Sequence, residues 1–269
     1  MLDARGHGAL PPLLMLHGFS SSGVHYAPLL PRMRRRVRRI LLPDFPGHGR
    51  SEVPAAGVSA ETVRDGLFEA LDTLIDEPVV AFGNSMGGFA AIRYAAARPD
   101  KVCGLFVVSP SGAPMPPGEV DAFRASFDLR SHADALRFVD DLFAHRVLMR
   151  QFLAWGVRQK FARAEHRALL TSLSREHFLA PEELQGLRMP VLLMWGRSDR
   201  ILPRASLAFF RAHLPRHARV ERPEGVGHSP FLESPGALAR RIVAFLWEVR
   251  GQPAVRMPRL VPAAHGERG

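Results

Sequence analysis

Four short apolar runs in the first 110 residues set the strongest limit on how this chain folds. They read PLLMLHG (12–18), RRILLPDFPGHG (38–49), VVAFGNS (79–85) and VCGLFVVS (102–109), and a fifth run, PVLLMWG, follows at 190–196. The first four are apolar on both faces, which is typical of strands buried in a parallel sheet. Helical patterns alternate with these runs, so the sequence predicts an α/β fold with a mostly parallel sheet.

The alternation is interrupted once, and this interruption predicts a division of the chain. After SPSGAPMPPG (109–118) comes a long helical stretch without a strand signal, and the α/β pattern resumes with the run at 190–196. We therefore expect an α/β core formed by 1–112 and 188–250, with an all-helical insertion at 113–187. The tail, 251–269, is rich in proline and arginine and is expected to be flexible.

The other predicted elements and the aromatic residues of the insertion fit this division. We interpret most of the aromatic residues of the insertion as packing between helices. Helices are expected over 23–33, 61–76, Met86 to about Arg98, 205–214 and 237–249, with a short strand at 218–223. The insertion carries Phe123, Phe127, Phe138, Phe143, Phe152, Trp155, Phe161 and Phe178.

Composition limits the classes of protein and site that this chain can represent. Its 269 residues, 46% hydrophobic and 23% charged, are typical of a globular protein with a sizeable core. Cys103 is the only cysteine, which excludes an intrachain disulfide and a cysteine-based zinc site. Its apolar surroundings predict a buried, inert thiol. No secretory signal and no apolar run of about 20 residues are present, so we expect a cytoplasmic protein without a membrane span.

The positive charge of the chain raises the alternative of nucleic-acid binding. The net charge is +10, and a dense run, RMRRRVRR, occupies 32–39. The run lies between a predicted helix and a predicted strand and has no interleaved aromatic residues. We interpret it as a solvated basic surface, and we expect no nucleic-acid partner. Steeply salt-dependent binding to DNA would favour the alternative.

A serine between glycines gives the first indication of chemistry. Residues 83–88 read GNSMGG and follow the apolar run VVAF, and the helical pattern FAAIRYAAA comes directly after. The pattern G-x-S-x-G between a strand and a helix is typical of a nucleophile elbow, in which a sharp turn exposes the serine. Glycines are needed because such a turn leaves no room for side chains on either side.

A serine hydroxyl needs a base, and the base needs an acid that orients it. Asp199 follows the predicted strand at 190–196, and His228 lies in a glycine-flanked loop after the last short strand. Alone, Asp199 would also fit a helix cap, and His228 would fit a surface loop. The order Ser85, Asp199, His228, each at a strand end, predicts a catalytic triad.

Acyl transfer also needs hydrogen-bond donors for the developing oxyanion. One predicted donor is the backbone N–H of Met86, directly after the serine. The other is the N–H of Phe19, in the loop His17-Gly18-Phe19, where Gly18 lets the backbone turn inward. His17 is an alternative base, but we interpret it as a structural loop histidine. No cofactor and no metal are expected.

The motifs together resemble the α/β-hydrolase superfamily along nearly the whole chain. The resemblance implies that Ser85 is the nucleophile, His228 the base and Asp199 the orienting acid. It implies that Asp44 and His48 are structural and that the helical insertion is a cap that selects the substrate. The motifs are HGF (17–19), PDFPGHGRS (43–51), GNSMGG (83–88), WGRSDRILP (195–203) and GHSPFLESP (227–235).

One departure from the family concerns the N-terminal edge of the sheet. Family members usually have two strands before the strand that leads into the HG motif, and here only about ten residues precede it. The N-terminal strands are therefore expected to be shortened or missing. Such an edge would expose the strand that begins at Ile40 and favour association.

The resemblance favours a carboxylic-ester hydrolase acting on small to medium, apolar acyl groups. Asn84 is similar to the corresponding residue of C–C hydrolases that cleave meta-ring-fission products, but those relatives usually have tryptophan where this chain has Ser229. C–C hydrolysis and acyl transfer to an alcohol stay open as alternatives, as does a binding role without catalysis. The substrate is expected to be a small molecule.

Overall fold

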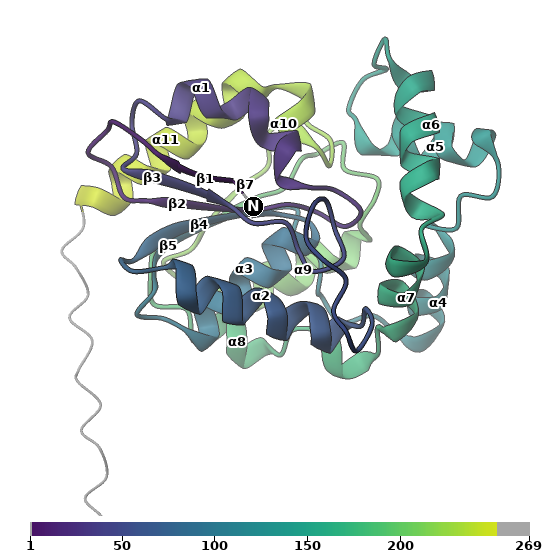
Figure 1. Ribbon diagram of the computed structural model, residues 1–269, viewed down its shortest axis with the longest axis horizontal. Coiled ribbons are helices and arrows are strands. Elements are labelled where there is room, and N and C mark those ends of the chain that lie inside the picture. Colours follow the sequence, from purple (N-terminus) through teal and green to yellow (C-terminus); the bar gives the residue numbers. More distant parts are fainter. Residues whose placement is uncertain (1, 252–269) are drawn as a thin grey trace, which may run out of the picture.

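The computed structural model describes residues 2–251 and shows a mostly parallel sheet with helices on both faces (Figure 1). The strand order is β1-β3-β2-β4-β5-β6-β7, and among these strands β1 alone runs antiparallel to its neighbour. The predicted α/β fold is confirmed. The strands are β1 (Leu2–Arg5), β2 (Leu13–Leu16), β3 (Arg39–Leu42), β4 (Val79–Asn84), β5 (Val102–Val108), β6 (Val191–Met194) and β7 (Arg219–Glu221).

Successive residues of the central strands point into two separate apolar cores, as expected for strands buried on both faces. Leu14 and Ala81 belong to the core beneath α2 and α3, whereas Leu13 and Phe82 belong to the core beneath α1 and α11. The flanking helices and short 3₁₀ segments are η1 (Gly23–Leu29), α1 (Leu30–Met33), α2 (Ala60–Leu74), α3 (Met86–Ala97), α9 (Arg204–His213), α10 (Pro230–Glu233) and α11 (Pro235–Gly251).

The chain between β5 and β6 is helical, and no strand occurs in this part of the described chain. In Figure 1, α5 and α6 lie farthest from the sheet. The last helix of the segment, α8, instead contacts α3 and α9 beside the sheet. The elements are α4 (Pro117–Ala125), α5 (His132–Leu142), α6 (Arg150–Phe161), α7 (Ala164–Ser172), η2 (Arg175–His177) and α8 (Pro181–Gln185). The division into a core and a cap at 113–187 stays a prediction.

Two of the aromatic residues in this segment do not pack between helices. Phe152 and Trp155 are 62% and 58% exposed, whereas Phe127 and Phe161 are buried and stack on one another. The predicted tail lies outside the described residues, except that Gly251 ends α11. Among the described helices, none is both long enough and apolar enough to cross a bilayer.

The N-terminal edge of the sheet, in the part of the chain that the structure describes, is formed by the strand β1. The expectation that β3 would be exposed at this edge is wrong, because Leu2 to Arg5 pair antiparallel with Leu42 to Arg39. The guanidinium of Arg39 also donates to both oxygens of Asp3, at 2.9 and 2.8 Å. The sequence LDAR gives little strand signal because it is half charged. Its pairing comes from backbone hydrogen bonds, which depend little on side-chain type.

Part of the basic run 32–39 is neutralised by acids at this edge. Arg38 pairs with Glu77, and Arg39 pairs with Asp76 as well as with Asp3. The arginines between Met33 and Val37 are exposed. This arrangement agrees with a solvated basic surface, and the absence of a nucleic-acid partner stays a prediction. Cys103, expected to be buried, is only partly so, although burial still raises the pKa of its thiol to about 11.

Deleting residues 2–9 should destabilise the protein and promote its association. The deletion removes the β1 pairing and the backbone hydrogen bonds of Gly6, His7 and Gly8 to the chain before β3. Each such bond contributes about 1 kcal/mol, so we expect a loss of several kcal/mol. It also exposes β3 as an unpaired edge.

Urea unfolding and light scattering measure the two effects of the deletion. Asp3→Asn serves as the control, since it weakens the ion pair with Arg39 and keeps the strand pairing. A deleted protein that stays monomeric, with an unchanged unfolding midpoint, would contradict this account of the edge.

Candidate active site

Ser85 occupies a sharp turn of one residue between β4 and α3. Its φ is 55° and its ψ is −121°, a backbone conformation that is uncommon for a residue with a side chain. Three hydrogen bonds hold the turn: the Ser85 N–H donates to the Val108 carbonyl, and the Ser85 carbonyl accepts from the N–H groups of Phe89 and Ser111. The surrounding sheet therefore fixes the serine at the carboxyl ends of the strands.

The flanking glycines are required by close approaches between backbones. A Cβ on Gly83 would lie 2.2 Å from the carbonyl oxygen of Gly87. A Cβ on Gly87 would lie 2.0 Å from the carbonyl oxygen of Leu16, on the neighbouring strand β2. Real Cβ atoms do not approach this closely. The predicted lack of room beside the turn is confirmed.

His228 and Asp199 come together as predicted from their positions after β7 and β6. The distance from His228 Nδ1 to Asp199 Oδ2 is 2.8 Å, and the Asp199 side chain has no exposed area. The other carboxylate oxygen of Asp199 accepts from the backbone N–H groups of Ile201 and Leu202. Asp199 is not the cap of α9, because that helix has Pro203 at its N-cap.

The electrostatics of Asp199 favour a carboxylate that stays ionised. Burial by itself would raise the pKa of this group. The charge and the hydrogen bond of His228, together with the backbone N–H of Ile201, outweigh burial and hold the pKa of Asp199 below its ordinary value. Because a carboxylate only accepts hydrogen bonds, His228 Nδ1 is the donor. This tautomer leaves His228 Nε2 as the acceptor.

Ser85 and His228 line the same cavity, which has a volume of about 380 Å³. The loop that carries His228 is held from two sides. The N–H of His228 donates to the carbonyl of Leu142 at 2.8 Å, and the carbonyl of His228 accepts from Asn84 Nδ2 at 3.0 Å. Asn84 Nδ2 also donates to the Val108 carbonyl. Sequence reasoning missed this role of Asn84, although a buried amide at the end of an apolar strand was a signal for it.

Two backbone N–H groups beside Ser85 have no acceptor within the described part of the chain. They belong to Phe19 and to Met86, the two predicted oxyanion donors. Met86 begins α3, where the helix leaves its first N–H groups unpaired and carries partial positive charge. Gly18 brings the Phe19 loop close, since a Cβ on Gly18 would lie 3.5 Å from Ser85 Cβ. The roles of these two groups stay predictions.

His17 has both ring nitrogens engaged in hydrogen bonds. Nδ1 contacts the carbonyl of Gly18 at 2.8 Å, and Nε2 accepts from the N–H of Phe45 at 3.1 Å. The ring is 1% exposed. These bonds agree with a structural histidine and leave no nitrogen free to act as a base. Asp44 is likewise used structurally, because its carboxylate accepts from the N–H groups of Gly23 and Arg50.

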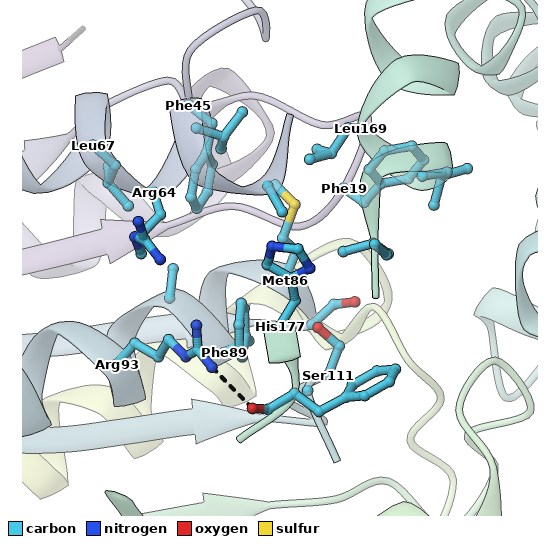
Figure 2. Close-up of a pocket in the computed structure, with 18 of the residues that line it drawn as sticks. Phe19, Phe45, Arg64, Leu67, Met86, Phe89, Arg93, Ser111, Leu169 and His177 are labelled. Atoms are coloured by element: carbon cyan, nitrogen blue, oxygen red, sulfur yellow. Dashed lines mark hydrogen bonds between the residues drawn. The ribbon is translucent and has the colours of Figure 1, made fainter. Parts of the chain in front are cut away.

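A second, apolar cavity of about 120 Å³ opens on the other side of Ser85. Figure 2 shows its lining, with Arg64 and Arg93 at one end and Phe19 at the other. Ser85, Phe19 and Phe127 line both cavities, whereas His228 lines only the larger one. The serine therefore stands at the junction of two spaces.

One group of possible metal ligands occurs among the described residues, formed by Glu61, Glu176 and His177. Its geometry is explained by a hydrogen bond, since His177 Nε2 lies 2.5 Å from a Glu61 oxygen. That the protein uses no metal and no cofactor stays a prediction.

Comparison with known proteins identifies relatives. The model of the alpha/beta hydrolase family matches residues 13–241. A pimeloyl-[acyl-carrier protein] methyl ester esterase of Aromatoleum aromaticum is 30% identical over 244 residues, covering 84% of this chain and 94% of the relative. The monoacylglycerol lipase ABHD6 of Mus musculus is 25% identical over 262 residues, covering 90% and 77%.

Solved structures of similar fold are also known. The crystal structure of a membrane phospholipase A, described as a bacterial virulence factor, matches with a TM-score of 0.77 and 26% identity, covering 93% of this chain and 83% of that one. A 2-hydroxy-6-oxo-6-phenylhexa-2,4-dienoate hydrolase from Rhodococcus sp. strain RHA1 matches with a TM-score of 0.76, covering 89% and 92%. Its identity is 20%, so this second likeness concerns the fold alone.

Acidification should destabilise the protein before its carboxylates titrate. Burial lowers the pKa of His17 to about 4 and that of His48 to about 3, against roughly 6.5 in the unfolded chain. Both rings are neutral in the fold, so their contribution is complete above pH 6.5 or so and falls as the pH drops toward these values. Each histidine should cost about 1.4 kcal/mol per pH unit in that window.

Urea unfolding at several pH values between 7.5 and 5 measures this slope. His48→Gln removes one of these groups and should reduce the slope by up to about 1.4 kcal/mol per pH unit. A free energy of unfolding that does not change over this range would contradict the neutral burial of the two rings.

Proposed function

This chain belongs to the alpha/beta hydrolase family, and from that premise we propose that it hydrolyses carboxylic esters through an acyl-enzyme on Ser85. The observation that carries the proposal is the meeting of Ser85 and His228 in one cavity, with His228 bonded to Asp199 at 2.8 Å. A strained serine, a base and a buried orienting acid are the components of nucleophilic acyl transfer.

The first half of the proposed reaction forms the acyl-enzyme. His228 Nε2 takes the proton of the Ser85 hydroxyl while the serine oxygen attacks the ester carbonyl. The N–H groups of Phe19 and Met86 donate hydrogen bonds to the developing oxyanion, and each such donor contributes about 10²–10³ in rate. The protonated His228 then gives its proton to the departing alkoxide, and Asp199 stabilises the imidazolium in between.

The second half releases the acid. A water molecule in the alcohol's former place loses a proton to His228 Nε2 and attacks the acyl carbonyl. The tetrahedral intermediate collapses, the proton returns to the Ser85 oxygen, and the carboxylic acid leaves. The cycle consumes one water and needs no redox partner.

The two cavities support an assignment of the acyl and alcohol sites. The leaving alcohol must lie beside His228, which supplies its proton, and His228 lines only the larger cavity. The acyl group then occupies the apolar cavity beside Met86. Its volume of about 120 Å³ is close to the roughly 150 Å³ that holds a benzene molecule, which fits a small to medium acyl group.

Ser85→Ala should abolish hydrolysis of p-nitrophenyl esters, with a loss of at least about 10⁴-fold in kcat, because no other group supplies the nucleophile. Asp199→Asn should cost about 10⁴-fold as well, since it favours the wrong tautomer of His228. Circular dichroism verifies the fold of both variants. Ester turnover that survives in folded Ser85→Ala would contradict the proposal.

The same assay, with added alcohols and with ring-fission diketones, separates the alternatives. Ester products from added alcohols would indicate an acyltransferase that uses the same triad. Turnover of diketones but not of esters would indicate C–C hydrolysis. Asn84 does not favour the second alternative here, because its amide is already used to hold the His228 loop.

Filling the two cavities separately should change two different specificities. Leu173 lines the acyl cavity only, and Gly156 lines the larger cavity with nothing within 4 Å of a Cβ placed there. Leu173→Trp should lower kcat/KM for longer acyl chains by about tenfold or more and leave the alcohol preference unchanged. Gly156→Leu should instead lower kcat/KM for esters of bulky alcohols and leave the acyl-chain preference unchanged. The measurement is kcat/KM over two ester series, and exchanged effects would overturn the assignment.

A further inference from the structure

Apolar side chains project from α6 and from the turn before it. Leu148, Met149, Phe152 and Trp155, here called the α6 patch, are 104%, 63%, 62% and 58% exposed. The rings of Phe152 and Trp155 stack with their centroids 6.3 Å apart. The opposite face of the helix packs against α5, through residues such as Ala154. A contiguous exposed group of this kind marks an interaction surface.

Positive charge flanks the α6 patch along the chain. Residues 142–164 contain five arginines and lysines and no aspartate or glutamate. Arg150 and Arg163 are paired with acids outside this segment, namely Asp140 and Glu165. The remaining three cations, Arg146, Arg158 and Lys160, make no ion pair with any residue that the structure describes. The charge of this surface is therefore complementary to an anionic partner.

The α6 patch adjoins the cavity that holds Ser85 and His228. Phe152 is mostly exposed and also lines that cavity, together with Leu153, Gly156 and Lys160 of the same helix. In Figure 1, α6 lies at the side of the molecule away from α1 and α11. A molecule held at the patch would thus lie at the entrance to the cavity.

We propose that the α6 patch docks the protein on a lipid surface with anionic headgroups. A helix with exposed tryptophan and phenylalanine among arginines, preceded here by an exposed leucine in the adjoining turn, is typical of one that lies in a membrane interface. The tryptophan ring is suited to that layer because its body is apolar and its N–H is polar. The larger cavity, which Ser85 and His228 line, then opens toward the lipid.

Other occupants fit these observations less well. In a symmetric pair of copies, the unpaired cations of each α6 would face those of the other and repel. A soluble acidic protein would pair with the cations, but pairing does not require four projecting apolar side chains. A lipid surface satisfies both features, since acyl chains take the apolar side chains and headgroups take the arginines.

Vesicle sedimentation tests the docking without turnover, so its failure is separate from any failure of the proposed function. Vesicles of equimolar phosphatidylglycerol and phosphatidylcholine should bind the protein, and vesicles of phosphatidylcholine alone should bind it much more weakly. Leu148→Ser with Trp155→Ser should lower the affinity about tenfold or more, and so should Arg146→Gln with Arg158→Gln. None of these residues lines the cavities, so hydrolysis of a soluble p-nitrophenyl ester should be unchanged.

Matched control variants remove similar groups outside the α6 patch. Val53→Ser with Trp247→Ser removes two exposed apolar side chains, and Arg35→Gln with Arg36→Gln removes two exposed charges. Both pairs should keep most of the vesicle affinity. In a Trp247→Phe background two tryptophans remain, the buried Trp195 and the exposed Trp155. The emission of Trp155 should shift to shorter wavelength on the anionic vesicles.

Several outcomes would overturn the proposal. Vesicle binding that is unchanged by Leu148→Ser with Trp155→Ser would show that the α6 patch does not carry it. An equal loss from Arg35→Gln with Arg36→Gln would show attraction by net charge only. Absence of vesicle binding, with a dimer that the apolar variant dissociates, would assign the patch to contact between copies. Absence of vesicle binding, with charge-dependent binding to polyglutamate, would favour an acidic protein.

Discussion

The close packing of the first turn of α3 against the end of β2 is the constraint on which the rest of the site depends. Gly87 lies so near the Leu16 carbonyl that no side chain fits between them. This contact forces the chain to reverse within one residue, which gives Ser85 its positive φ. It also brings the free N–H of Met86 and the loop of Gly18 beside the serine. One backbone contact thus positions the proposed nucleophile and its oxyanion donors.

Hydrogen bonds then connect this turn to the other two members of the proposed triad. Asn84 joins the end of β4 to the carbonyl of His228, and His228 in turn holds Asp199. The N–H of His228 donates to the carbonyl of Leu142, at the end of α5. The helical segment between β5 and β6 therefore supports His228 directly, in addition to lining the cavities. A shift of α5 relative to the sheet would therefore move the His228 loop through this hydrogen bond.

The sequence predicted the parts of this structure that follow from repetition and order. Apolar runs on both faces predicted the sheet, and three polar residues after strand ends predicted the meeting of Asp199 with His228. It did not reveal β1, because strand pairing at an edge rests on backbone groups and the LDAR side chains carry little signal. Nor did it separate the exposed Phe152 and Trp155 from packed aromatic residues, since helical spacing does not show which face lacks a neighbour.

The most direct test of the central claim is to locate the residue that a fluorophosphonate probe labels, by peptide mass spectrometry of the folded protein. The account predicts one label, on Ser85, because this serine occupies the strained turn at the junction of the two cavities, beside a histidine that is held by a carboxylate. It also predicts that His228→Ala strongly slows the labelling. Folded protein that stays unlabelled, or a label on another serine that persists in Ser85→Ala, would contradict the account.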